Sequence, residues 1–358
     1  MATIKDVAKL AQVGVGTVSR CLAGKGGVSA KAEQKVSQAM KQLNYRPNSL
    51  ARALSTQRSN IIGVWLPSLS GPFYQHILQA IEYELRLHDK HLIIANAEGS
   101  NSNEEYLQHL DYLINRDCDG VLMVCPEIAI SDLLIAQANY PPLVFINHST
   151  DLLSKQSFSV DHYAGGCLAA NSLLALGHKN IACISGRLSA QDAQQRQQGF
   201  VDELARQGRP INPELCIEGS FDFATSQFAV QQLLDKQLPF DALFCGSDKV
   251  ALVALSILQG AGIKVPQQVS VLGYDDVDFA AVASPPLSTI AIPIKQMATA
   301  VRNDRLKWFI MIFKNSAPNC IVTGSVIRST SKLPRMSSDE LGWATDDAAV
   351  GITLTKIP

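Results

Sequence analysis

The chain has 358 residues, of which 47% are hydrophobic and 18% charged, and its formal net charge at pH 7 is −1. This composition excludes a disordered chain and is sufficient to fill the cores of two or three compact units. The start, MATIKDVAKL, lacks the apolar run of a signal peptide, and no stretch reaches the length of a membrane span. The sequence therefore predicts a cytoplasmic protein without a membrane partner.

The charge is distributed unevenly along the chain. Residues 1–60 carry ten Lys or Arg and two acidic residues, whereas residues 61–358 carry 21 basic and 30 acidic residues. Basic side chains bind a polyanion by releasing its counterions. The asymmetry favours a nucleic-acid-binding head on a separate body, although a basic N-terminus is by itself common.

The eight cysteines are scattered along the chain. They form no Cys-x-x-Cys pair, and no histidine stands at metal-ligand spacing from them. Cys125, Cys183 and Cys245 each lie in an apolar run that is typical of a buried strand. We therefore expect reduced cysteines in the core, with no metal and no cofactor.

The N-terminal residues have the pattern of two short helices joined by a tight turn. Residues 4–11 carry apolar side chains at i, i+3, i+4 and i+7, residues 12–14 break the pattern, and residues 15–22 resume it. A further helix is expected over residues 29–43, with Ser29 as its N-cap. This is the arrangement of a helix-turn-helix, whose second helix can enter the major groove, although an ordinary three-helix bundle has the same pattern.

Several head residues are candidates for contact with DNA. Val15, Gly16 and Arg20 face outward on the second helix and can read base edges, while hydroxyl groups nearby suit phosphates. Residues 47–60 contain a short segment that is marginal as an isolated helix, so it is expected to form on DNA, where an apolar wedge can enter the minor groove. A frayed linker is the alternative. The predicted DNA contacts are Thr3, Val15, Gly16, Thr17, Ser19, Arg20, Ser29, Asn48, Ala51 and Leu54.

From residue 61 onward, short apolar runs alternate with helical patterns in two series. Strands are expected near 61–66, 92–95, 120–125 and 143–146, then near 180–185, 215–219, 242–245 and 269–274. Helices are expected near 73–88, 103–116 and 131–138, then near 191–207, 224–236 and 247–261. Such alternation predicts an α/β body of two lobes with parallel sheets, whose ligand site lies at the carboxyl ends of the strands.

Polar and aromatic residues follow several of these strands. Carboxylates, an amide, a guanidinium and aromatic faces together suit a polyhydroxylated ligand. Each has a plainer alternative: Asp248 can cap a helix, and Asp275 with Asp276 can shape a turn. The predicted effector contacts are Ser70, Phe73, Tyr74, Asn147, Asp192, Arg196, Phe221, Ser247, Asp248 and Asp275.

The motifs D-V-A, T-V-S-R, V-S, N-Y-x-P-N and L-A-R-x-L stand in order within residues 6–54. In these residues the chain resembles the DNA-binding head and hinge helix of the lactose- and galactose-repressor family, nearest the galactose-repressor branch. The resemblance implies that Val15, Gly16 and Arg20 read the half-site and that Leu54 is the wedge at the operator centre. Gly14 departs from the serine usual in the family, which removes a cap and a phosphate contact.

The body also resembles that family, through S-D-K-V-A, G-I-K-V-P-Q-Q-V-S-V-L-G-Y-D-D and G-S-V-I-R. The resemblance implies a fold like that of periplasmic sugar-binding proteins. It also implies effector contacts at Asn147, Arg196, Phe221, Ser247 and Asp275, with Ser247 replacing the usual Asn. Residues 300–319 are more basic and aromatic than is usual, and we keep them as a helix of the first lobe.

The expected organisation is a helix-turn-helix domain at 1–46, a hinge helix and linker at 47–60, a two-lobed body at 61–335 and a loose tail at 336–358. The lobes are expected to comprise about 61–160 plus 292–320, and 161–291 plus 321–335. The resemblance implies a homodimeric repressor that binds a pseudo-palindromic operator of roughly 16 to 18 base pairs under control of a small sugar.

Three alternatives stay open at this stage. The effector can be a purine instead of a sugar, or the chain can be a cytosolic solute-binding protein, although a basic head argues against the latter. An enzyme is disfavoured, because the chain has no phosphate-binding G-x-x-x-x-G-K-[ST] loop and the adjacent carboxylates of Asp275 and Asp276 point in different directions.

Overall fold

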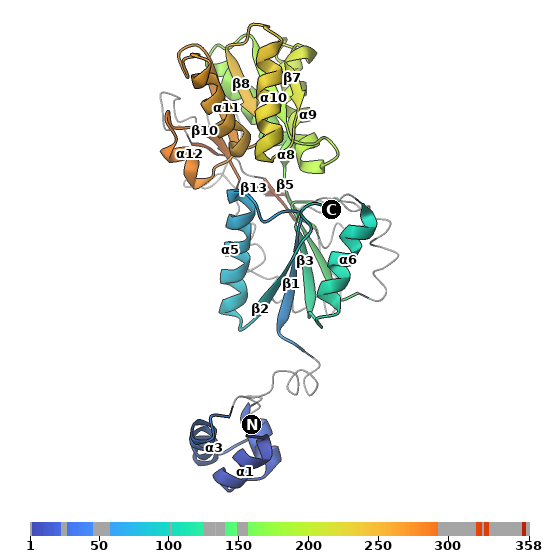
Figure 1. Ribbon diagram of the computed structural model, residues 1–358, viewed down its shortest axis with the longest axis vertical. Helices are drawn as coiled ribbons and strands as arrows, with labels where there is room; N and C mark the ends of the chain where they lie inside the picture. The colour runs from blue at the N-terminus through green and yellow to red at the C-terminus, as the bar shows by residue number, and fades with distance from the viewer. Residues whose placement is uncertain are drawn as a thin grey trace. The chain divides into compact units, whose positions relative to one another are not determined.

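The computed structural model describes residues 2–22, 27–45, 58–100, 102–124, 133, 140–148 and 157–292, and the strands 320–323, 326–328 and 353–355 (Figure 1). The chain divides into two units. The first comprises Met1–Ile61 with Asp117–Asp119, and the second comprises Ile62–Arg116 with Gly120–Pro358. We call them the head and the body.

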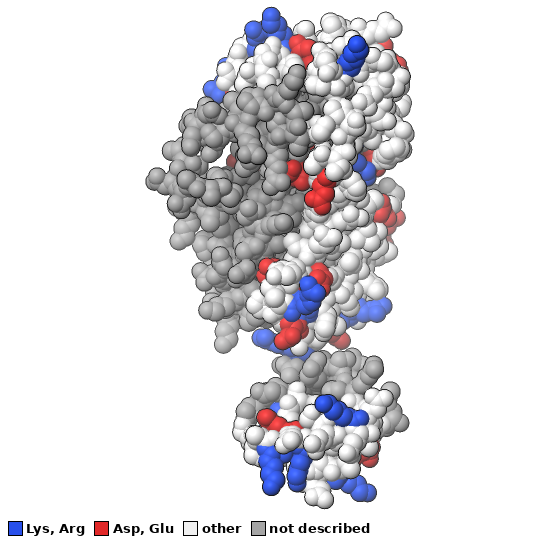
Figure 2. All heavy atoms as spheres, turned by 90° about the vertical axis from the view of Figure 1, so that its left-hand side faces the viewer, with Lys and Arg blue, Asp and Glu red and all other residues white. Residues whose placement is uncertain are grey.

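The head contains helices α1 (Ile4–Ala11), α2 (Val15–Leu22) and α3 (Ala30–Gln42), so the predicted helices are confirmed. Gln12 ends α1 in the left-handed conformation, with φ 55°, and opens the turn toward α2. The three helices enclose a small core of Val7, Ala8, Ala11, Val18, Val36 and Ala39. Figure 2 shows more Lys and Arg than Asp and Glu on the visible face of the head.

The first sheet of the body has the strand order β13-β11-β5-β4-β3-β1-β2 within the described residues. Its strands are β1 (Ile61–Leu66), β2 (His91–Asn96), β3 (Gly120–Val124), β4 (Leu143–Ile146), β5 (Ser157–Val160), β11 (Cys320–Thr323) and β13 (Thr353–Thr355). Helices α5 (Pro72–Leu87) and α6 (Asn103–Ile114) lie on opposite sides of β1 to β3 (Figure 1).

The second sheet has the order β12-β10-β9-β8-β6-β7. Its strands are β6 (Ile181–Ser185), β7 (Cys216–Glu218), β8 (Ala242–Cys245), β9 (Ser270–Asp275), β10 (Ser288–Ala291) and β12 (Val326–Arg328). Its helices are α8 (His162–Ala175), α9 (Gln191–Arg206), α10 (Phe223–Asp235), α11 (Asp248–Gly260) and α12 (Asp278–Val282), with the 3-10 turn η3 (Pro213–Leu215).

The prediction of parallel sheets is confirmed for the central strands, but two strands at the sheet edges are antiparallel. β12 pairs antiparallel with β10, and β13 pairs antiparallel with β11. The sequence patterns missed β5 and β10 to β13, which are only three or four residues long. β11 joins the first sheet although the expected lobe boundary fell at residue 320, and β13 lies in the segment expected as a loose tail.

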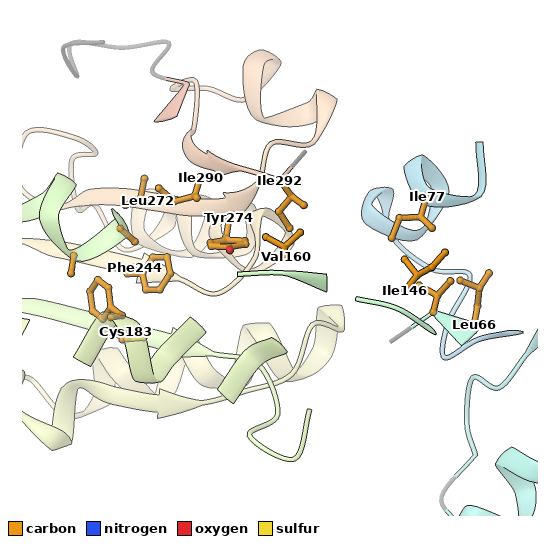
Figure 3. Close-up of a cluster of buried hydrophobic side chains, with 14 of the residues drawn as sticks. Leu66, Ile77, Ile146, Val160, Cys183, Phe244, Leu272, Tyr274, Ile290 and Ile292 are labelled. Carbon is orange, nitrogen blue, oxygen red and sulfur yellow. The ribbon is translucent and has the colours of Figure 1, made fainter. Parts of the chain in front are cut away.

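Both faces of the second sheet are buried, which explains its continuous apolar runs. Cys183, Phe244, Leu272 and Tyr274 pack in one cluster with α8 and α9. The alternate residues Ala182, Ile184, Leu243 and Cys245 pack in another cluster with α10 and α11. Figure 3 shows the first of these clusters, with Leu66, Ile77 and Ile146 of the first sheet and α5 gathered as a separate group.

Close approach of α8 and α9 depends on glycine. A Cβ atom on Gly199 of α9 would overlap the carbonyl oxygen of Tyr163 and lie 2.8 Å from its carbonyl carbon. On α8, a Cβ atom on Gly166 would lie 2.8 Å from the backbone nitrogen of Phe200. The two helix backbones therefore touch directly, and this contact sets the start of α8 beside α9.

Some predictions fall outside the described residues. These are the contacts Asn48, Ala51 and Leu54, the helices expected at 131–138 and 300–319, and the tail at 336–358 apart from β13. Among the helices that are described, none is both long and apolar enough to cross a membrane. The cysteines with described side chains, Cys21, Cys118, Cys167, Cys183, Cys216 and Cys245, are free thiols.

Candidate functional site

Polar side chains gather at the carboxyl ends of strands in the body, where parallel sheets form their sites. We define the polar cluster as Asn147, His162, Asp192, Arg196, Tyr274 and Asp275. Asn147 directly follows β4, and Asp275 is the last residue of β9. Both have positive φ angles, 58° and 120°, which non-glycine residues rarely adopt and which often mark functional positions.

Arg196 is the centre of the polar cluster and is only 2% exposed. Its Nη1 donates to the carbonyl oxygen of Gly246, and its Nη2 lies 3.6 Å from the Asp192 carboxylate. The guanidinium carbon lies 3.8 Å from the centre of the Tyr274 ring. Its Nε is buried and has no hydrogen-bond partner among the described residues. The cluster therefore retains a buried donor that a bound molecule can satisfy.

His162 connects this guanidinium to the first sheet. It is fully buried, its Nε2 lies 2.6 Å from Asn147 Oδ1, and its Nδ1 lies 3.2 Å from both Tyr274 Oη and Arg196 Nη2. Asn147 Nδ2 in turn donates to Asp192 Oδ2 at 3.4 Å. These contacts close a continuous polar ring from β4 through α8 and α9.

Phe221 covers the guanidinium from another side, with its ring centre 5.6 Å from the Arg196 guanidinium carbon. The Phe221 ring can lie here only because residues 186 and 246, which are next to it, have no side chain. A Cβ atom on Gly186 would overlap the ring, and one on Gly246 would lie 3.3 Å from it. An aromatic face next to hydrogen-bonding groups is suited to a sugar ring or a base.

Burial dominates the electrostatics of the polar cluster. It raises the pKa of Asp275 well above the usual value, while the Arg196 guanidinium opposes that rise. Burial also lowers the pKa of His162 well below its usual value, and Arg196 lowers it further. His162 is therefore neutral at physiological pH.

Two residues predicted as effector contacts have structural partners within the protein. Ser247 is the N-cap of α11, and its hydroxyl oxygen accepts from the backbone nitrogen of Val250 at 3.3 Å. Asp248 is the first residue of the helix and not its cap. Its carboxylate accepts from Val277 N at 2.9 Å and from Thr289 Oγ1 at 2.5 Å, which ties α11 to the segment after β9 and to β10.

Three further predicted contacts lie near the start of α5. Ser70 Oγ donates to Glu98 Oε1 at 2.7 Å and lies 2.6 Å from Ser68 Oγ. Phe73 and Tyr74 pack edge to face, with ring centres 5.2 Å apart, against the cluster that contains Ile77. The polar cluster therefore brings together Asn147, Asp192, Arg196 and Asp275, with Phe221 beside it, but its described contacts do not include Ser70, Phe73 or Tyr74.

Sequence reasoning missed His162 and Tyr274. Tyr274 ends the apolar run that predicts the strand near 269–274, and His162 follows β5, a strand too short to detect by its pattern. A polar residue directly after Val160-Asp161 was the available signal, because the next helix begins there. A small cavity of about 40 Å³, lined in part by Pro266, Ser270 and Ser288, lies at the opposite ends of β9 and β10 and is unrelated to this chemistry.

On the head, α2 presents Val15, Gly16, Ser19 and Arg20 to solvent, and Val15 is 43% exposed. Thr17 is half-buried. Thr3 forms a capping box with Asp6, in which its hydroxyl donates to the carboxylate at 2.8 Å. Ser29 caps α3 by accepting from Ala32 N at 3.3 Å, and its own hydrogen stays able to donate to a phosphate. The exposed face of α2 is thus the side available to a DNA groove.

A helix-turn-helix head and a two-sheet body with polar groups at its strand ends define a DNA-binding regulator with an attached ligand-binding domain. Residues 3–48 match the bacterial regulatory proteins of the lacI family, and residues 59–310 match the periplasmic binding proteins and sugar binding domain of the LacI family. The chain belongs to the LacI family of transcriptional repressors.

Relatives support this assignment along most of the chain. The ribose operon repressor of Haemophilus influenzae is 31% identical over 335 residues, covering 91% of this chain and 99% of that protein. The Lac repressor dimer bound to operator and the anti-inducer ONPF has a TM-score of 0.77 and 28% identity, covering 87% of this chain and 92% of that chain. A complex of the transcriptional regulator CelR with cellobiose has a TM-score of 0.68 and 27% identity, covering 92% and 99%. That these relatives regulate transcription is consistent with a chain that is not an enzyme.

Proposed function

We propose that this protein represses transcription as a homodimer on a pseudo-palindromic operator and that a small uncharged sugar bound at the polar cluster controls its affinity for DNA. The observation that carries the ligand site is the buried Arg196, whose Nε lacks a partner while its other nitrogens are fixed. A buried unsatisfied donor costs free energy, so its retention favours a site completed by a ligand.

The chemistry of the polar cluster favours an uncharged, oxygen-rich ligand. Asp192 and Asp275 bring two carboxylates beside the single guanidinium of Arg196. A phosphorylated ligand would meet repulsion from the Asp192 carboxylate, whereas sugar hydroxyl groups can donate to both acidic side chains and accept from Arg196. The match to a sugar-binding domain, the relative that represses a ribose operon and the relative bound to cellobiose support the same class.

The head supports a dimer on DNA because one recognition helix reads few base pairs. Two copies of α2 would present Val15, Gly16 and Arg20 to two half-sites. Effector binding then changes operator affinity by the free energy that couples the two sites, with the effector and operator influencing each other equally. Such a repressor acts with the chromosome in the cytoplasm.

The experiment begins with thermal shift of the full chain against D-ribose, cellobiose, sugar phosphates and purine bases, because a molecule that binds the folded state raises the melting temperature. Arg196→Ala should abolish the shift given by an active sugar and the response of operator binding to it. Operator binding without sugar should persist. Arg206→Ala is the matched control, since Arg206 lies on the same helix but pairs at the surface with Glu203 at 2.6 Å.

The outcomes separate the parts of the proposal. A shift from a neutral sugar that is lost in Arg196→Ala and kept in Arg206→Ala supports it. A response only to purines overturns the sugar assignment and leaves the repressor, and an unchanged response in Arg196→Ala removes this residue from the site. Arg196→Lys keeps the buried charge but loses the planar fork, so it provides a folded variant should the alanine variant fail to fold.

A further inference from the structure

We propose that His162 is the positioning residue of this site. Held as a neutral imidazole with its proton on Nε2, it fixes the side-chain amide of Asn147 so that the carbonyl oxygen faces the imidazole and the NH₂ group faces Asp192. The consequence for ligand choice rests on the proposed function, whereas the assignment of protons rests on the contacts alone.

The first step is the contact between His162 and Arg196. Nη2 of the guanidinium lies 3.2 Å from His162 Nδ1. A guanidinium can only donate hydrogen bonds, so Nδ1 must be the acceptor and carries no proton. A neutral imidazole then has its proton on Nε2, which becomes a donor.

The second step follows at Asn147. The Nε2–H group of His162 points at an Asn147 side-chain atom 2.6 Å away, and that atom must accept. It is therefore the amide oxygen, and the amide nitrogen occupies the other branch, 3.4 Å from Asp192 Oδ2. An ionised carboxylate only accepts hydrogen bonds, so the contact with Asp192 independently requires the same orientation of the Asn147 amide.

The groups at the two ends of this series of hydrogen bonds therefore determine which atoms donate and which accept along it. Arg196 is a group that only donates, Asp192 is a group that only accepts, and the ambiguous His162 and Asn147 lie between them. A flipped Asn147 amide would place its NH₂ against the Nε2–H and its oxygen against the Asp192 carboxylate, which gives two repulsive contacts. A protonated His162 would place a second cation beside Arg196 in a fully buried position.

His162 contributes to recognition by fixing which atom of the Asn147 amide can face a ligand. With its oxygen held by His162, Asn147 can turn only its amide nitrogen toward a ligand. The ligand group that meets it must be an acceptor, such as a hydroxyl, ether or carbonyl oxygen. His162 itself is fully buried and contacts Asn147, Tyr274 and Arg196, so it acts on a ligand through them.

The decisive measurement is an NMR spectrum of the imidazole nitrogens in the full chain labelled with ¹⁵N-histidine, between pH 8 and pH 6. The signal of His162 is identified by its loss in His162→Gln. We expect a protonated Nε2, an unprotonated Nδ1 and no change over this range. A proton on Nδ1, or titration of the ring to a cation within the range, would overturn the assignment.

Two amide variants test the positioning role. His162→Gln places an N–H donor near the original Nε2, whereas His162→Asn is too short to reach Asn147. Binding of D-ribose should be largely retained in His162→Gln and weakened by about tenfold or more in His162→Asn. Equal weakening in both variants, at equal melting temperature, would refute the role. If D-ribose fails to bind the wild-type chain, ribose is not the effector, while the spectrum still decides the proton positions.

Discussion

The direct contact between α8 and α9 makes Gly199→Ala a sharp test of the packing that builds the site. The new Cβ atom would overlap the carbonyl oxygen of Tyr163 and lie 2.8 Å from its carbonyl carbon. Non-bonded carbon atoms prefer about 3.5–4.0 Å, so the two backbones must separate by roughly 1 Å. Neither partner is a flexible side chain that can rotate away.

The expected magnitude follows from two opposing effects. Overpacking of a close contact costs about 1–3 kcal/mol, and a contact between two backbones belongs at the upper end. Alanine is favoured over glycine in a helix by about 1 kcal/mol, which offsets part of that cost. The net loss is about 2 kcal/mol, which corresponds to a melting temperature lower by about 3–4 °C for a body of almost 300 residues.

Gly260→Ala is the matched control, because Gly260 ends α11 and a Cβ atom there meets nothing within 4 Å. This variant should melt at or slightly above the wild-type temperature in the same assay. Gly199→Ala should also bind its effector more weakly, since Tyr163 is the neighbour of His162 at the start of α8. A Gly199→Ala variant that melts at or above the wild-type temperature would refute the close contact of the two helices.

Two further predictions concern a helix cap and the hinge. Asp222→Ala should cost about 1 kcal/mol, because Asp222 caps α10 by accepting from Thr225 N at 2.9 Å. Burial raises the pKa of Asp222, but hydrogen bonds from Ser220 and Thr225 lower it to about 2. Its contribution is therefore complete above about pH 4 and lost as the pH falls through 2, so the difference between variant and wild type, followed by urea unfolding, should vanish there. Leu54→Ala should weaken operator binding and reduce DNA bending, measured by energy transfer between labelled DNA ends, with sugar affinity unchanged; equal bending would exclude Leu54 as the wedge.

The parts of the fold that could be predicted are those whose burial repeats with a clear period. The head helices have apolar stripes around Val7, Val18 and Val36, and the central strands are continuous apolar runs between helices. The short strands β10 to β13, which lie at or next to one edge of each sheet, lack both signals, since three or four residues cannot show a period. Their pairing is decided by contacts with residues far away in the sequence.

The candidate site was predicted where the chemistry stands directly after a strand. Asn147 and Asp275 were found in this way, and Arg196 stood on the helix that follows β6. The same rule included Ser247 and Asp248, whose side chains the structure uses for a helix cap and for links to β10. Sequence position shows that a residue lies at a strand end, but not which neighbouring donor or acceptor already satisfies it.

The contacts of the polar cluster explain why a buried charge is kept at this position. A buried ion pair often contributes less stability than apolar packing of the same volume, because desolvation offsets its attraction. Arg196 is only partly compensated, since Asp192 lies 3.6 Å from Nη2 and Nε has no partner in the described part of the chain. Positive φ angles at Asn147 and Asp275 add strain at the same place. A ligand that supplies an acceptor for Arg196 Nε removes the free-energy cost of that unpaired donor, which is already present in the free protein. Binding of such a ligand therefore stabilises the folded protein.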